Sequence, residues 1–274
     1  MSSPVLQVAP FNPRRFKSTA DHYVRGRLAY PEDLVERMTQ LIPLGKKDRV
    51  LDLGCGPGFL AVAFRKHVGE ALGIDPEPDM LAAAERYARE HGAEVSFRQG
   101  SSYDLSPELG KFRLVTMGRS FHWMDRVATL VALDALVETG GAVALFGDRY
   151  LEVPENGWWK RVDAIFTEYK RKDPAREADP KGAGPWRSRH EPVLLDSAFR
   201  YLQRISVVRR LETPVERILD RALSLSVASP ERLGSDREAF LDRIRAILAE
   251  EAPEGIVSEV VETEALLAFR PDYR

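Results

Sequence analysis

The chain has 274 residues, of which 44% are apolar and 30% are charged, and its formal net charge at neutral pH is -2. This balance excludes wholesale disorder and supplies enough apolar side chains for a sizeable core. It offers no global attraction to nucleic acid or to an anionic membrane, and a single cysteine excludes an internal disulfide and a cysteine zinc cluster.

The amino-terminal part predicts an arm followed by two helices. Residues 1–17 contain three prolines without apolar periodicity, which predicts an extended arm. They lack the apolar run of a secretory signal, and no later run approaches a membrane span, so we expect a cytoplasmic protein. In residues 18–45, the capping-box spacing of Ser18 and Asp21 and the helical periodicity after Pro31 predict two helices that form an N-terminal lid over the first strand.

Residues 46–147 predict alternating strands and helices. Short apolar runs indicate the strands, and apolar side chains at helical spacing indicate the helices between them. This alternation is typical of a mainly parallel sheet with helices on both faces. After a first strand that ends at Leu53, the expected strands are 71–74, 95–98, 112–117 and 142–146, and the expected helices are 59–68, 76–90 and 127–137.

The alternation stops in residues 148–198, which predict a lid or substrate insertion. A helix is expected through Trp158 and Phe166, followed by a stretch dense in proline, glycine and charge, as in a mobile surface segment. Residues 199–274 then predict strands and helices that complete the sheet, ending in a long strand over 256–269. We interpret residues 1–274 as one domain.

The stretch Val50-Leu51-Asp52-Leu53-Gly54-Cys55-Gly56-Pro57-Gly58 joins a buried strand to a glycine turn. Glycine lets the backbone bend sharply and lets a ligand approach the main chain. In an open parallel sheet such a turn marks the ligand site. A carboxylate in a buried strand is costly unless it is paired, so we expect Asp52 to meet a cation, which a bound ligand could supply.

Three features separate the nucleotide classes that such a turn could bind. Asp75 follows Gly54 by 21 positions, which suits an acid that bonds ribose hydroxyls. Phe59 replaces the third glycine or alanine of a dinucleotide fingerprint, and its ring is expected to obstruct pyrophosphate binding. Asp52 would repel a pyrophosphate but attract the ammonium of an amino-acid-bearing nucleoside. A nicotinamide or flavin oxidoreductase is therefore the disfavoured alternative.

The glycine turn resembles the first motif of class I S-adenosylmethionine-dependent methyltransferases. The resemblance covers residues 18–147 well and the final strands more loosely. Within this superfamily the chain is most similar to the branch that acts on small molecules. It continues through Gly73-Ile74-Asp75, Gln99-Gly100-Ser101-Ser102-Tyr103, Phe112-Arg113-Leu114-Val115 and Ser120-Phe121-His122-Trp123.

The resemblance implies a fold and a reaction. The fold is α/β, a doubly wound, mainly parallel seven-stranded sheet of order 3-2-1-4-5-7-6, with the last strand antiparallel, helices on both faces and a lid insertion. The reaction is methyl transfer from S-adenosyl-L-methionine to an oxygen, nitrogen or carbon of a small-molecule acceptor, which leaves S-adenosyl-L-homocysteine. Neither nucleic acid nor a membrane is an expected partner. A protein that binds the cofactor without methyl transfer is a further alternative.

The resemblance also assigns roles to residues. Asp52 and the glycine turn hold the methionine moiety, Asp75 holds the ribose hydroxyls, and Arg27 meets the cofactor carboxylate. Ser101 stands where relatives often have an acid for the adenine amine. The expected cofactor-binding residues are Tyr23, Arg27, Asp52, Gly54, Cys55, Gly56, Gly58, Asp75, Pro76, Met80, Ser101, Ser102, Tyr103 and Arg119.

His122 is the candidate general base, because it follows the fourth strand on the ligand side of the sheet and its ordinary pKa suits proton removal near neutral pH. The alternative is that it only packs its loop against the next helix. The other histidines are scattered and suggest no metal site. The arginines between 200 and 221 are interpreted as solvated faces. The expected substrate contacts are Phe121, His122, Trp123, Trp158, Trp159 and Trp186.

Overall fold

The computed structural model describes residues 18–171 and 190–271, and in these ranges seven strands form one sheet of order β3-β2-β1-β4-β5-β7-β6. β7 is antiparallel to both of its neighbours, and the other pairs are parallel. The predicted fold class is confirmed. The strands are β1 (Arg49–Leu53), β2 (Glu70–Asp75), β3 (Ser96–Gln99), β4 (Phe112–Gly118), β5 (Val137–Tyr150), β6 (Tyr201–Pro214) and β7 (Ile256–Phe269).

Helices cover both faces of the sheet. Leu133 of α5 and Leu194 of α8 belong to the apolar core on one face, and Met38 of α2 and Phe64 of α3 belong to the core on the other. The helices are α1 (Ala20–Gly26), α2 (Glu32–Leu41), α3 (Phe59–Arg65), α4 (Pro78–Glu90), α5 (Arg126–Leu136), α6 (Gly157–Arg171), α8 (Glu191–Leu195), α9 (Val215–Leu223), α10 (Pro230–Leu233) and α11 (Arg237–Glu251).

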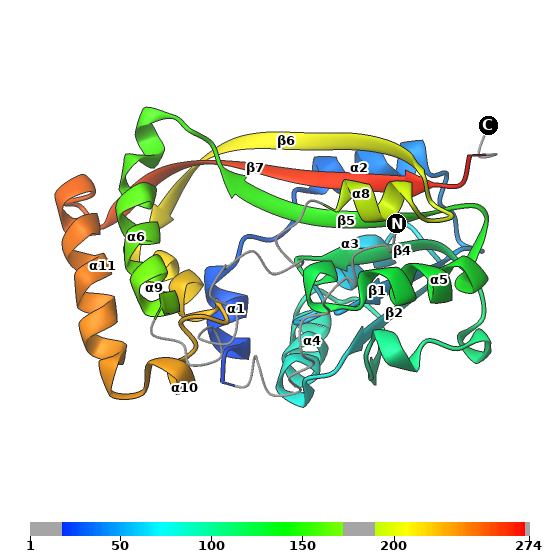
Figure 1. Cartoon of the computed structure of the whole chain (residues 1–274), viewed down its shortest axis with the longest axis horizontal. Coiled ribbons are helices and arrows are strands. Elements are labelled where there is room, and N and C mark those ends of the chain that lie inside the picture. The colour runs from blue at the N-terminus through cyan, green and yellow to red at the C-terminus, as the bar shows by residue number, and fades with distance from the viewer. Residues whose placement is uncertain (1–17, 172–189, 272–274) are drawn as a thin grey trace, which may run out of the picture.

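Three strands are much longer than the rest of the sheet. β5, β6 and β7 have 14 residues each, whereas β1 has five. Figure 1 shows them extending to one end of the molecule, where α6, α9, α10 and α11 gather. These helices have their own apolar core, which includes Trp158, Phe166, Phe240 and Ile244. We call this group of helices the helical body.

The helical body differs from the expected lid. Residues 148–198 and the first helices were expected to form the covering segment. In the structure α6 also packs against α11, which belongs to the part expected to complete the sheet. The expected arm of residues 1–17 and most of the proline-rich stretch lie outside the described residues. In the part of the chain that the structure describes, no helix combines the length and apolarity needed to cross a bilayer.

Two local predictions were wrong. Ser18 does not cap the first helix: α1 begins at Ala20, and its N-cap residue Thr19 makes no side-chain capping bond. The fifth strand is not confined to 142–146, because the antiparallel ladder with β7 runs from Ala142 to Tyr150. Pairing with a strand more than 100 residues away in sequence extends β5, and no local periodicity reports it.

Candidate cofactor site

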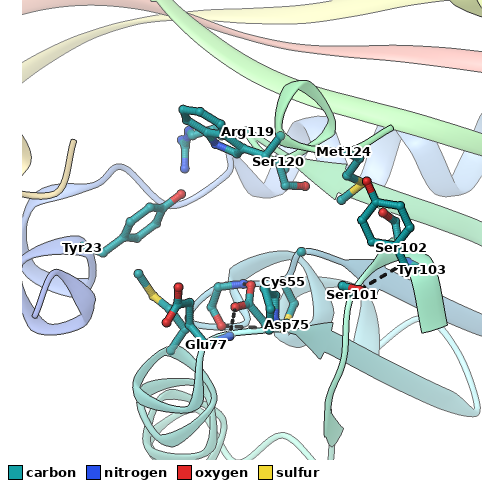
Figure 2. A pocket seen from close by; sticks show the side chains of 16 residues that line it. Tyr23, Cys55, Asp75, Glu77, Ser101, Ser102, Tyr103, Arg119, Ser120 and Met124 are labelled. Atoms are coloured by element: carbon teal, nitrogen blue, oxygen red, sulfur yellow. Dashed lines mark hydrogen bonds between the residues drawn. The ribbon is translucent and has the colours of Figure 1, made fainter. Parts of the chain in front are cut away.

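A pocket lies at the carboxyl ends of β1, β2 and β4, with α1 on one side (Figure 2). The pocket brings together twelve of the residues predicted for the cofactor or the substrate. These are Tyr23, Gly54, Cys55, Gly56, Asp75, Pro76, Met80, Ser101, Ser102, Tyr103, Arg119 and Trp123. Sequence reasoning missed four further lining residues, Glu77, Gly118, Ser120 and Met124.

The three glycines of the turn have positive φ angles, 67° at Gly54, 51° at Gly56 and 79° at Gly58. Residues that carry a side chain rarely adopt such angles. Their surroundings differ. A Cβ at Gly54 would lie 2.6 Å from Cβ of Ser120, and one at Gly58 would lie 2.9 Å from the Phe97 ring, whereas one at Gly56 would meet nothing within 4 Å. Gly56 therefore faces open pocket, while Gly58 serves packing and does not line the pocket.

Asp75 fastens the glycine turn to the end of β2. Its Oδ2 accepts the N–H of Gly56 at 2.8 Å, and its Oδ1 accepts the N–H of Glu77 at 2.9 Å. Each carboxylate oxygen has a second lone pair for a ligand hydroxyl. Burial raises the pKa of Asp75 to about 6, although the two N–H donors act in the opposite direction. Glu77, only 4% exposed, adds a second carboxyl at the pocket.

Asp52 is not among the residues that line the pocket, and no cationic side chain of the described residues pairs with it. It is 1% exposed, and its carboxyl accepts the N–H of Ala61 at 3.1 Å and the hydroxyl of Thr116 at 3.0 Å. Burial raises the pKa of Asp52 to about 7. The charge that the sequence left unexplained is therefore accommodated inside the fold, between β1, α3 and β4.

Phe59 also lies differently from the expectation. Its ring packs 4.8 Å from that of Tyr87 and 6.0 Å from that of Tyr23, measured between centroids. It is buried and is not among the residues that line the cofactor pocket. The side chain points toward α4 and α1, so the Phe59 ring does not obstruct the pocket as expected.

Residues 101–103 form one rim of the pocket. Ser101 caps a single helical turn and is bonded to Asp104, whose Oδ2 accepts the Ser101 N–H at 2.7 Å and its hydroxyl at 2.8 Å. Tyr103 is 58% exposed, so its ring has room to lie against a bound ligand.

Arg119, at the end of β4, has a left-handed backbone with φ of 57°, which is unusual for a residue with a long side chain. Its guanidinium forms an ion pair with Asp148, donates to the carbonyl of Leu28 at 3.0 Å and lies 4.6 Å from the centre of the Tyr30 ring. Although burial acts to lower the pKa of Arg119, Asp148 holds it well above its ordinary value. Next to Arg119, the Ser120 hydroxyl donates to the carbonyl of Leu53 at 2.9 Å.

The expected substrate residues are not brought together. Trp123 lines the cofactor pocket, but His122 lines a neighbouring cavity, and their rings lie 4.5 Å apart. Phe121 is a core residue that lines the same neighbouring cavity as His122, and Trp158 is buried in the helical body. Trp159 lines a separate cavity beside the helical body, and Trp186 lies outside the described residues.

Arg27, expected at the cofactor carboxylate, is likewise absent from the pocket lining. Its Nε donates to Ser224 Oγ of α9 at 2.8 Å, and its guanidinium lies 5.2 Å from the centre of the Tyr23 ring. Arg27 instead lines the same separate cavity as Trp159. Arg27 therefore lies behind Tyr23, on the side of the helical body.

Four consecutive carbonyl oxygens, those of residues 26–29, each accept a hydrogen bond from a different arginine. We call this arrangement the arginine clasp. Three of its arginines belong to the run that was interpreted as solvated, so that interpretation was wrong for them. In order along residues 26–29, the donors are Arg221, Arg217, Arg119 and Arg209, at 3.1, 3.2, 3.0 and 3.4 Å.

Comparisons with known proteins agree with this site. The methyltransferase domain family matches residues 50–141. An uncharacterized methyltransferase of Schizosaccharomyces pombe is 38% identical over 108 residues, which are 36% of this chain and 39% of that protein. A trans-aconitate 2-methyltransferase of Mycobacterium sp. strain KMS is 30% identical over 208 residues, which are 75% of this chain and 65% of that protein. The matches span about two fifths of the first curated relatives.

A solved structure with the same fold is that of an S-adenosylmethionine-dependent methyltransferase from Thiobacillus denitrificans in complex with S-adenosyl-L-homocysteine. Its TM-score is 0.52 at 18% identity, and the alignment covers 92% of this chain and 97% of the other. Strand order, the position of the pocket and the family match lead to one assignment. Residues 50–141 of the chain are a methyltransferase domain, with the strand order and pocket position of the class I S-adenosylmethionine-dependent methyltransferases.

Proposed function

We propose that the protein transfers a methyl group from S-adenosylmethionine to a small-molecule acceptor. The observation that carries the proposal is the convergence of the glycine turn, Asp75, the Ser101–Tyr103 rim and the end of β4 on one pocket. Two relatives are named a trans-aconitate 2-methyltransferase and a ubiquinone biosynthesis O-methyltransferase, and these names support a small acceptor.

The lining residues fit this cofactor. The open space at Gly56 admits a ligand against the main chain, and Asp75 and Glu77 offer carboxyl oxygens for ribose hydroxyls. Tyr103 and Met80 provide apolar surface for a purine. When bound, the cofactor supplies a methyl group that its sulfonium already activates. The residues of the chain then need to orient the acceptor and exclude water.

Tyr23 and Arg119 lie on the side of the pocket away from the glycine turn, where an acceptor would approach (Figure 2). A general base at His122 remains a prediction. Its test is the pH profile of kcat/KM in His122→Gln: loss of the acidic limb at unchanged affinity for S-adenosylhomocysteine supports the role, and an unchanged profile contradicts it.

Calorimetry with S-adenosylhomocysteine tests the proposed cofactor, and incubation of the protein with methyl-labelled S-adenosylmethionine and a metabolite extract tests the transfer. We expect binding and a labelled product. Absence of binding contradicts the proposal. Binding without a labelled product favours the alternative of a cofactor-binding protein without methyl transfer, and absorbance of a nicotinamide or flavin in the purified protein favours an oxidoreductase.

A further inference from the structure

A second cavity of about 390 Å³ lies between β5, α1, α6 and α9, beside the cofactor pocket. Pairs of residues in contact lie at the boundary between the two. Arg119 faces the cofactor pocket and forms an ion pair with Asp148, which faces the second cavity. Tyr23 and Arg27 form a similar pair, with the Arg27 guanidinium 5.2 Å from the centre of the Tyr23 ring. The two spaces therefore adjoin, with Arg119 and Tyr23 at their boundary.

One side of the second cavity is aromatic. The Trp159 ring lies 4.3 Å from the Tyr150 ring and 6.1 Å from the Phe166 ring, measured between centroids, and all three residues line the cavity. Ile218 and Leu225 add aliphatic surface. Such a surface suits the body of an apolar or aromatic molecule.

Several charged residues line the second cavity. Among the described residues, Arg27 is the one of them that has no oppositely charged group within ion-pair distance. Its one side-chain hydrogen bond is to Ser224, through Nε, so its two terminal nitrogens have no acceptor among the described residues. Burial lowers the pKa of Arg27, and so do the nearby charges of Arg119 and Arg221, whereas Tyr23 and Asp148 act in the opposite direction without reversing the shift. The other lining charges have partners within 4.0 Å: Arg221 with Glu259, Asp148 with Arg119, Arg149 with Glu262, and Lys170 with Asp163.

A half-buried guanidinium without a counter-charge is costly, and a ligand anion offsets that cost. The two terminal nitrogens of a guanidinium match the two oxygens of a carboxylate in a bidentate pair. A dianion such as a phosphate monoester would need a second unpaired cation, which the described lining lacks.

We propose that the second cavity is the acceptor subsite and that it takes aromatic or similarly apolar monocarboxylates, whose carboxylate binds Arg27 and whose body lies against Trp159. This inference rests on the proposed methyl transfer, because it assigns the acceptor of that reaction. It places Arg27 at the acceptor instead of at the cofactor carboxylate.

The test is calorimetry on the full chain saturated with S-adenosylhomocysteine, with benzoate, phenylacetate and indole-3-acetate as ligands and their primary amides as neutral matches. We expect at least one acid to bind about tenfold or more tightly than its amide, as a charge-assisted pair implies. If no acid binds more tightly than its amide, the inference is overturned.

Arg27→Gln should abolish the preference for the acid while affinity for S-adenosylhomocysteine stays within about twofold, and Arg27→Lys should restore part of the preference. Retained cofactor binding shows that the variant is folded. Arg245→Gln is the matched control, since Arg245 is a partly exposed arginine of α11 paired with Asp242. If Arg27→Gln instead weakens S-adenosylhomocysteine and leaves the preference for the acid, Arg27 is a cofactor residue and the inference fails. If the parent protein does not bind S-adenosylhomocysteine, the proposed function itself fails.

Discussion

The carboxylate of Asp75 accepts the backbone N–H of Gly56 at 2.8 Å, so the end of β2 holds the turn that follows β1. One side chain thus shapes the glycine turn and also faces the pocket that the turn borders. The same carboxyl has a pKa raised to about 6 by burial, which makes its charge depend on pH near neutrality.

Affinity for S-adenosylhomocysteine should therefore fall as the pH falls through about 6. Protonation removes the charge that favours bonds from ribose hydroxyls, and the loss between pH 7.5 and pH 5 should be about tenfold if the ionised form is required. Calorimetry over this range measures it. Asp75→Asn should bind more weakly at pH 7.5 and show a flatter profile, and parallel profiles for the two proteins would contradict the assignment.

Asp52 should make the folded protein less stable as the pH rises. Its folded pKa of about 7 exceeds the ordinary value of 3.8, so between these values the folded state holds a proton that the unfolded state has lost. From pH 5 to pH 7, the parent should lose up to about 2 kcal/mol of unfolding free energy relative to Asp52→Asn. Urea denaturation at both pH values measures this. If the parent and Asp52→Asn differ in unfolding free energy by the same amount at pH 5 and at pH 7, Asp52 is already ionised in the folded protein at both.

Gly26→Ala should separate α1 from α9. A Cβ at Gly26 would lie 2.1 Å from the backbone nitrogen of Arg221, and backbone cannot move aside as a flexible side chain can. We expect a loss of about 1–3 kcal/mol in unfolding free energy and weaker binding of S-adenosylhomocysteine, because Tyr23 is carried on α1. Gly157→Ala is the control, since an added Cβ there meets nothing within 4 Å. Equal effects of the two substitutions would refute the steric argument.

Glu259 and Arg221 should be strongly coupled. Glu259 is fully buried, Arg221 is 9% exposed, and their closest nitrogen and oxygen atoms are 2.6 Å apart. Glu259→Gln leaves a buried guanidinium without its carboxylate, so we expect a loss of about 3–5 kcal/mol in unfolding free energy. In a double-mutant cycle with Arg221→Met, the double variant should lose clearly less than the sum of the single losses. Additive losses would mean that the pair contributes no interaction of its own.

The sequence predicts the sheet and the pocket well because their signals are local. The glycine turn, Asp75 and residues 101–103 each lie at the carboxyl end of a strand, and parallel strands bring such ends together at one edge. The remaining features depend on distant partners. Thr116, which bonds Asp52, follows it by 64 positions, and Ser224, which bonds Arg27, follows it by 197. The local periodicity of the sequence does not indicate partners so far apart along the chain.

The helical body was missed for the same reason. α6 and α11 are each visible as helices in the sequence, but their packing joins segments on either side of β6. The alternation in residues 201–210 resembles a strand with one solvated face, and the arginines there were assigned to that face. Arg209 instead reaches the carbonyl of Ala29, which shows that a long side chain on a strand edge need not end in solvent.

The arginine clasp has a consequence for ligand exchange. The four carbonyls of residues 26–29 are occupied by side chains from the end of β4, from β6 and from α9, and Asp220 of α9 also binds Arg25 and His22 of α1. Because these bonds join α1 to α9, Tyr23 cannot swing away as an independent flap without breaking most of them. Movement of Tyr23 away from the cofactor pocket therefore requires α1 and the residues after it to part from α9, from β6 and from the end of β4 together.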